Sequence, residues 1–185
     1  EEGTKYWDQY YISKKILSKY YCTQVDIIKL IKGKKVSLFQ PQFAFAYRVI
    51  DSYQIYQPYN PEHKFFNSLL DNYIFGFQQL PPTGELLIVD KSMKDVMFCD
   101  YLGLPAIAPK AEGIMIPKAY FKVLKTRFKR IVIMLDNDKA GILNANKYPE
   151  EYDKIFLKSA KDKTDLVLSV GIKKAKKEIF SLLNT

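Results

Sequence analysis

Residues 130–141 read Arg130-Ile-Val-Ile-Met-Leu-Asp136-Asn-Asp138-Lys-Ala-Gly141, and this stretch decides the fold. Its five consecutive apolar residues, three of them β-branched, predict a strand over 130–135 that is buried on both faces. Two aspartates follow directly, before a helix expected over 140–147. Because open α/β sheets bind their ligands at the carboxyl ends of their strands, Asp136 and Asp138 are the first candidates for a functional site.

Two carboxylates this close in sequence suit a hard cation, Mg²⁺ or Mn²⁺, whose shell is usually completed by water and substrate phosphates. A structural alternative is a polar turn in which one aspartate caps the next helix and the other is solvated. The motif by itself leaves both open. The single His63 and the widely separated Cys22 and Cys99 exclude a zinc site made by this chain alone.

Around this stretch, strands and helices alternate, which is typical of a parallel sheet. Residues 84–185 are therefore predicted to form an α/β domain, with further strands over 86–90, 105–108 and 155–157. Its other helices are expected from the N-cap Ser92 to 101, over 117–126, and over 165–183. Residues 1–83 are predicted to form a smaller α+β subdomain, with helices over 6–20 and 22–31 and strands over 36–39, 43–50, 53–56 and 73–78.

The overall composition of the chain limits the classes of protein to which it can belong. At 185 residues and 48% hydrophobic content, without a long apolar run, the chain is expected to be soluble and globular, with no transmembrane span and no signal peptide. It begins without Met, which suggests a piece of a longer protein. Two cysteines in apolar contexts favour buried thiols in a reducing compartment over a disulfide.

The net charge of +9 is concentrated in the C-terminal part. Residues 1–109 hold 12 basic and 11 acidic side chains, whereas residues 110–185 hold 17 and 9. This asymmetry favours a polyanionic partner, and nucleic acid is the first candidate. Lysine-rich composition and solvated helix faces are the alternatives.

Three motifs resemble the TOPRIM domain, the metal-binding α/β module of DnaG-like primases, topoisomerases and some nucleases. Asp136-Asn-Asp138 followed by Gly141 resembles its second motif, and Lys161-Asp-Lys-Thr-Asp165 resembles its third. The segment at the first motif differs from the family's pattern: Lys91-Ser-Met-Lys-Asp95 stands where the family has Glu-Gly-x-x-Asp. Lys91 thus replaces the family's catalytic Glu, and the string from Lys91 to Met97 is similar to phage-type primases.

The resemblance implies a primase core that makes RNA primers on single-stranded DNA from ribonucleoside triphosphates. It also implies Mg²⁺ or Mn²⁺ as cofactor, and a zinc-binding module and a replicative helicase outside this chain as partners. The location implied is the cytoplasm, that of the host if the protein is phage-encoded. The carboxylates expected at the metal are Asp136, Asp138, Asp162, Asp165 and Asp90. Catalytic roles are expected for Lys91, Asp136, Asp138 and Glu112, with Glu112 or Asp90 supplying the missing carboxylate. The expected contacts to substrate and nucleic acid are Arg48, Lys64, Lys94 and Lys161.

Other protein classes remain open on the sequence. A phosphatase of the haloacid-dehalogenase type also has Asp-x-Asp after an apolar strand, but Lys139-Ala140 and the late position of the motif argue against it. A TOPRIM nuclease or topoisomerase would need the Glu that Lys91 replaces. A non-catalytic nucleic-acid-binding module with a degenerate site is the remaining alternative.

Overall fold

The structure is a computed structural model, and it describes residues 2–32, 35–41, 43–49, 52–70, 72–111 and 113–184 of the chain. Glu112 lies outside the described residues, and so does position 50 of the strand predicted over 43–50. In the described ranges, no helix is both long and apolar enough to cross a membrane.

A five-stranded sheet with the order β11-β10-β8-β9-β7 forms the centre of the larger part of the molecule. Neighbouring strands from β11 to β9 are parallel, and the edge strand β7 pairs antiparallel with β9. The bounds are β7 Ile74–Phe75, β8 Gly84–Val89, β9 Ala106–Pro109, β10 Phe128–Ile133 and β11 Asp153–Lys154. The predicted α/β class, with a mostly parallel sheet flanked by helices, is confirmed.

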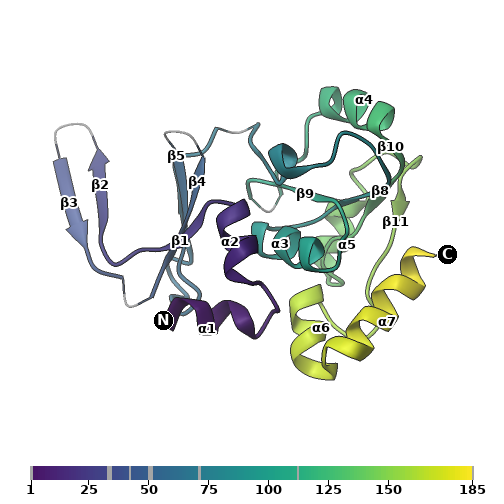
Figure 1. Ribbon diagram of the computed structural model, residues 1–185. Helices are drawn as coiled ribbons and strands as arrows, with labels where there is room; N and C mark the ends of the chain where they lie inside the picture. Colours follow the sequence, from purple (N-terminus) through teal and green to yellow (C-terminus); the bar gives the residue numbers. More distant parts are fainter. Residues whose placement is uncertain are drawn as a thin grey trace.

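Helices cover both faces of this sheet (Figure 1). They are α3 Met93–Tyr101, α4 Lys118–Arg127, α5 Lys139–Ala145, α6 Lys163–Val170 and α7 Ile172–Leu183. Side chains from α4 and α5 share one buried cluster with Leu87 and Ile131, whereas those from α3, α6 and α7 share another with Ile88 and Val132. Successive strand residues point to opposite faces, so the continuous apolar runs of β8 and β10 supply both clusters.

The N-terminal part is a four-stranded antiparallel sheet with the order β1-β4-β5-β6, preceded by two short helices. The bounds are α1 Glu2–Asp8, α2 Lys14–Lys19, β1 Cys22–Gln24, β4 Phe45–Val49, β5 Ser52–Tyr56 and β6 Phe65–Asn67. Its core is aromatic: Trp7 is fully buried, and its ring centroid lies 4.9 Å from that of Phe45. Burial of large rings is what stabilises so small a sheet.

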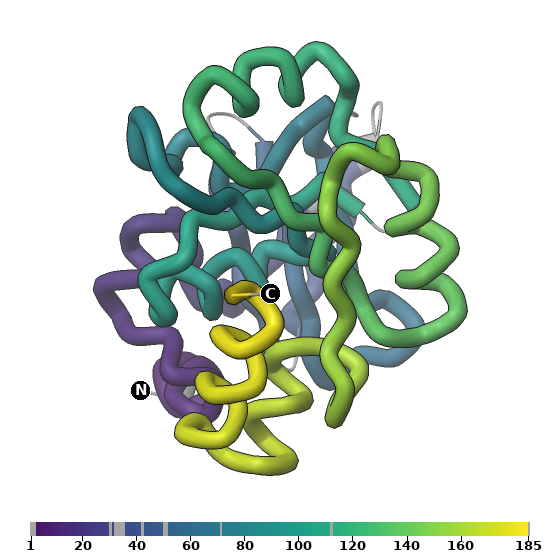
Figure 2. The backbone as a smooth tube through the Cα atoms, turned by 90° about the vertical axis from the view of Figure 1, so that its right-hand side faces the viewer, coloured from purple at the N-terminus to yellow at the C-terminus, as the bar shows by residue number. Residues whose placement is uncertain are grey.

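The N-terminal and C-terminal parts pack together. Tyr47 of β4 contacts Phe75 of β7 at 6.1 Å between ring centroids, and the buried cluster on the α3 face continues from Tyr6 to Leu183. Helix α2 packs against α3, and in Figure 2, where the yellow C-terminal helix is in front, the purple N-terminal helices lie behind it in the view. The domain boundary at residue 83 stays a prediction, and β7, which precedes it, belongs to the central sheet.

A two-stranded hairpin, β2 (Ile28–Lys32) with β3 (Lys35–Phe39), extends away from the rest of the molecule (Figure 1). The helix predicted over 22–31 is therefore wrong, because this segment forms β1 and β2. Its β-branched residues Thr23, Val25 and Ile27 favour extended backbone, and cross-strand pairing with β4 and β3 supplies the hydrogen bonds that a helix would have made internally.

Other boundaries also differ from the prediction. The helix expected over 6–20 is interrupted at Tyr11, whose φ is 60°, and restarts where Ser13 caps α2. The strand expected over 155–157 lies earlier, as β11, although the amide of Ile155 still donates to the carbonyl of Ile133 at 3.0 Å. Of the strand expected over 73–78 only β7 forms, and a 3₁₀ helix, Phe77–Gln79, follows it. Strand β6 was not predicted.

Candidate active site

The candidate site lies where the connections of the central sheet diverge. Strands β8 and β10 are neighbours, but the chain leaves β8 toward β9 on one side and leaves β10 toward β11 on the other. Their carboxyl ends carry Asp90-Lys91 and Asp136-Asn137-Asp138. Such a divergence opens a crevice in which α/β sheets bind ligands.

The Asp136-Asn137-Asp138 turn is anchored on three sides. Asp138 caps α5, because its Oδ1 accepts a hydrogen bond from the amide of Gly141 at 2.7 Å. The amide of Asn137 donates to the carbonyl of Lys161, and its side-chain Nδ2 donates to the carbonyl of Leu157, each at 2.7 Å. The structural alternative is thus correct for one oxygen of Asp138, while its Oδ2 and the Asp136 carboxylate are left for other partners.

Gly141 allows α5 to approach this turn. A Cβ built on Gly141 would lie 2.1 Å from the backbone oxygen of Asp136, a separation that no side-chain rotation can relieve. We expect Gly141→Ala to destabilise the fold by about 3 kcal/mol, because the helix and the turn must move apart. Chemical denaturation measures this, with exposed Ala140→Ser as the control. An unchanged free energy of unfolding in Gly141→Ala would contradict the close approach.

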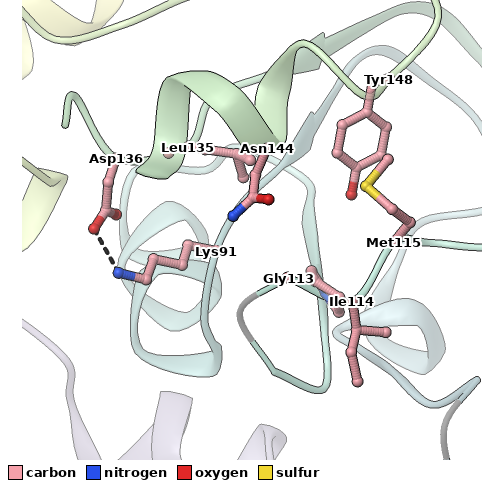
Figure 3. A pocket seen from close by; sticks show the side chains of 10 residues that line it. Lys91, Gly113, Ile114, Met115, Leu135, Asp136, Asn144 and Tyr148 are labelled. Carbon is pink, nitrogen blue, oxygen red and sulfur yellow. Dashed lines mark hydrogen bonds and ion pairs between the residues drawn. The ribbon is translucent and has the colours of Figure 1, made fainter. Parts of the chain in front are cut away.

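Two lysines converge on the aspartates. Lys91 and Asp136 point toward each other across the crevice (Figure 3), with 2.5 Å between Nζ and Oδ2. Nζ of Lys161 lies 2.8 Å from Oδ2 of Asp138 and 3.5 Å from Oδ2 of Asp136. Burial raises the pKa of Asp136, which is 2% exposed, and the Lys91 ammonium opposes that shift. The hydrogen bond from Lys161 lowers the pKa of Asp138.

A divalent cation fits this carboxylate pair. Among the described residues, no group of three or more His, Cys, Asp or Glu side chains could hold a metal ion, so a cage made by those residues alone is excluded. However, the Oδ2 atoms of Asp136 and Asp138 both lie within 3.5 Å of one cation, the Lys161 ammonium, so a single positive centre can contact both carboxylates. Mg²⁺ commonly binds one or two carboxylates and takes its other ligands from water and phosphate. Asp136 and Asp138 meet that requirement.

Asp90 has a different environment. Its Oδ2 lies 2.7 Å from Nζ of Lys163, and both side chains are nearly fully buried. The Lys163 ammonium also donates to the carbonyl of Met134 at 3.3 Å, and the thiol of Cys99 donates to Asp90 at 3.4 Å. Breaking such a buried pair leaves an uncompensated charge, so this contact holds β8 to the start of α6.

A cavity of about 440 Å³ opens beside the crevice, between the antiparallel sheet and the carboxyl ends of the parallel strands. Its wall includes the rings of Tyr47, Tyr56, Phe65 and Phe75. Its charged lining consists of five lysines and two aspartates: Lys64, Lys91, Lys94, Lys110, Lys161, Asp95 and Asp162. A volume of this size with an excess of positive charge suits a small anionic ligand that carries an apolar ring.

Asp95 is a residue of this lining that the sequence reasoning missed. It is 3% exposed, and its Oδ2 accepts from the hydroxyl of Ser92 at 2.5 Å. Its buried Oδ1 has no hydrogen-bond partner among the described residues. Burial, followed by the charges of Asp90 and Asp162, raises its pKa to about 7. The pattern Ser92-x-x-Asp95, a capping pair at the start of α3, was the available signal.

The raised pKa of Asp95 predicts a pH-dependent stability. Because the folded pKa exceeds the ordinary value of 3.8, the folded state binds the proton more tightly, and this stabilisation is lost as pH rises from about 4 to about 7. Asn cannot ionise, so Asp95→Asn should gain stability relative to wild type over that window, on the order of 2–4 kcal/mol. Urea unfolding of both proteins at pH 4 and pH 8 measures the difference. A pH-independent difference would contradict the raised pKa.

The structure brings most of the predicted site residues together. Lys64, Lys91, Lys94, Lys161 and Asp162 line the cavity, and Asp136 adjoins it through Lys91. Asp162 also caps α6, accepting from the amide of Asp165 at 2.7 Å. Lys94 lies 4.8 Å from the ring centroid of Tyr10, and its ammonium holds the pKa of Asp162 low against the effect of burial.

Two predicted residues lie elsewhere. Arg48 is exposed and follows Tyr47, so strand alternation directs it to the opposite face of the antiparallel sheet. The Asp165 side chain is exposed in the first turn of α6 and does not line the cavity. Glu112 is outside the described residues; of its chain neighbours, Ala111 lines the cavity and Gly113 lines the small pocket of Figure 3.

The sequence matches no protein-family model and no curated protein. Solved structures do match. The E. coli primase catalytic core superposes with a TM-score of 0.69 at 15% identity, covering 97% of this chain and 71% of that one. The primase fragment of the bacteriophage T7 primase-helicase protein gives 0.68 at 18% identity, covering 93% and 70%. A DnaG primase catalytic domain bound to single-stranded DNA gives 0.67 at 15%, covering 96% and 72%.

The chain has the fold of a DnaG-like primase core. At these identities the likeness concerns the fold, and it extends over nearly the whole chain, N-terminal sheet included. The DnaG-like architecture expected from the three motifs is confirmed. The roles of individual residues rest on the geometry of the site.

Proposed function

We propose that this chain is the catalytic core of a DNA primase, which joins ribonucleotides into short RNA primers on a single-stranded DNA template. The observation that carries the proposal is the cavity of about 440 Å³, in which five lysines and a wall of aromatic rings lie beside the Asp136-Asn137-Asp138 turn. The triphosphate, the base and the bound divalent cation of a nucleotide substrate each have matching chemistry here.

The lysines would bind the triphosphate. Lys64 comes from the N-terminal part, whereas Lys94 lies in the first turn of α3 and Lys161 precedes α6, so these three lysines line the cavity from different elements. Held in this way, the phosphates lose part of their mutual repulsion and are positioned for in-line attack. The rings of Tyr56 and Phe65, stacked at 5.2 Å, could hold a base by stacking.

Asp136 and Asp138 would hold the catalytic Mg²⁺ or Mn²⁺. When bound, the cation supplies charge neutralisation at the reacting phosphates. The turn that carries these carboxylates is fixed by Asn137 and by the cap of α5, so their positions are set before substrate arrives. Glu112 and Asp90 remain candidates for a further carboxylate, and the contact of Asp90 with Lys163 favours Glu112. This arrangement corresponds to a TOPRIM domain in which Lys91 replaces the usual Glu.

The template and the protein partners follow from the same proposal. Single-stranded DNA would bind through its phosphates to the basic surface of residues 110–185, so its affinity should fall steeply with salt. A zinc-binding module and a replicative helicase outside this chain are the expected partners, and the T7 neighbour is itself part of a primase-helicase protein. Arg48 is proposed as a DNA contact away from the cavity.

A second candidate is a nucleic-acid-binding module without catalysis. The observation that favours it is that both aspartates of the turn are paired with lysines, and that among the described residues no third acid completes a group that could hold a metal ion. A nuclease is the third alternative.

Primer synthesis tests the proposal directly. The protein is incubated with single-stranded DNA, the four ribonucleoside triphosphates and Mg²⁺ or Mn²⁺, both unaided and with a short annealed RNA primer. The primed template matters because it tests extension separately from initiation, the step in which a zinc-binding module is expected to help. Template-dependent RNA extension supports a primase. DNA binding without synthesis supports a non-catalytic nucleic-acid-binding module, and shortened DNA supports a nuclease.

A further inference from the structure

Lys161 places one ammonium group between the two carboxylates of the Asp136–Asp138 pair. The distances from Nζ are 2.8 Å to Asp138 and 3.5 Å to Asp136. The Lys161 side chain is 49% exposed, whereas that of Asp136 is 3% exposed. Backbone geometry sets this position, because the carbonyl of Lys161 accepts from the amide of Asn137 at 2.7 Å. The lysine is therefore held at the turn by the main chain as well as by charge.

The same ammonium also borders the cavity that we assign to the triphosphate. A lysine has a flexible four-carbon stem, so its charge can turn between two nearby anions without a change of the backbone. On one side are the two carboxylates, and on the other is the space lined by Lys64 and Lys94. Lys161 thus lies at the border between the proposed cation position and the proposed phosphate position.

We propose that Lys161 is an exchangeable internal cation of the site. It competes with a divalent ion for Asp136 and Asp138, and once displaced it pairs with the phosphates of the nucleotide. The competition follows from charge, because an ammonium and a divalent ion cannot share the same two oxygens without strong repulsion. The second half of the inference rests on the proposed function, whereas the first half depends only on this chain's own contacts.

This exchange predicts opposite effects on two ligands. Removing the Lys161 charge should tighten divalent-cation binding, because the one ammonium that contacts both carboxylates no longer competes, while Lys91 still pairs with Asp136 in wild type and variant alike. It should weaken triphosphate binding, because one phosphate partner is lost. A lysine with a purely structural role would not move the two affinities in opposite directions. Lys161→Met is the appropriate variant, since it keeps a long apolar stem and removes the charge.

The experiment measures Mn²⁺ binding without nucleotide, from the electron paramagnetic resonance signal of the free ion. We expect the Kd for Mn²⁺ to fall about two- to fivefold in Lys161→Met, the factor that corresponds to one partly exposed ion pair. Lys173→Met, at an exposed position of α7, removes the same net charge and should leave the Kd unchanged. Calorimetry with inorganic tripolyphosphate, without metal, should show weaker binding to Lys161→Met than to Lys173→Met.

An unchanged or higher Kd for Mn²⁺ in Lys161→Met overturns the proposal, and so does an equal fall in both variants. If circular dichroism shows that Lys161→Met does not fold, Lys161→Gln takes its place under the same criteria. Failure of the wild-type protein to make primers would refute the proposed function but leave the Mn²⁺ competition intact. Conversely, active primer synthesis with no change in Mn²⁺ binding would refute the exchange alone.

Discussion

Asp136→Asn is expected to lower primer synthesis by at least about 10³-fold, because a cation at the transferred phosphate contributes several kcal/mol to transition-state stabilisation. The amide keeps the shape of the carboxylate but loses the charge that would hold the cation. The fold should survive, since Lys91, the 2.5 Å partner of Asp136, is 26% exposed and can be solvated when its counter-charge is lost. Extension of a primed template measures the loss.

Asp153→Asn is the matched control for this experiment. Asp153 is the first residue of β11 in the central sheet and also pairs with a basic side chain, Arg130 at 2.6 Å, but it is 54% exposed and does not line the cavity. Its replacement should leave synthesis within about twofold of wild type, because a surface ion pair contributes little. Wild-type rates in Asp136→Asn would refute a cation-binding role for Asp136.

Lys91→Glu should strongly lower polymerisation, although Glu is the residue that the resemblance to TOPRIM domains predicts at this position. The structure places the Lys91 ammonium against Asp136, so a carboxylate there would put two like charges together beside the phosphate site. We expect a loss of at least about 10²-fold in primer extension, as for removal of one preorganised electrostatic contact, together with weaker triphosphate binding.

Lys91→Met separates the two effects of that substitution. It removes the ammonium without adding a negative charge, so its loss of activity should be smaller than that of Lys91→Glu. Primer extension and nucleotide affinity are measured on both variants. Should Lys91→Glu match wild type in both assays, Lys91 has no part in the site and the altered first motif needs another explanation.

The sequence alone predicted most elements of the α/β half. The strand before Asp136 and the helix from Ser92 to Tyr101 were predicted closely, because their signals are local: a continuous apolar run, and a capping serine before a helix. The DnaG-like architecture followed from the motifs at the ends of these elements. Local signals persist in the folded protein when each one agrees with the tertiary structure.

Residues 22–31 are a segment for which the prediction from local sequence signals was wrong. Their apolar pattern fitted a helix, yet they form β1 and β2, because the partner strands β4 and β3 lie later in the chain. Strand propensity depends on such neighbours more than helix propensity does. The edge strand β7 likewise is defined by its pairing with β9, more than thirty residues away.

For the candidate site, too, some features could be predicted from the sequence and others could not. The sequence by itself determined which carboxylates follow the central strand and that the chain is basic. Only the tertiary structure decided that Lys161 bridges Asp136 and Asp138, that Lys163 pairs with Asp90, and that Arg48 faces away from the cavity. The physical reason is that these are contacts between side chains 23 to 73 residues apart. Their geometry depends on strand order and on which face each strand presents, and a one-dimensional pattern does not carry that information.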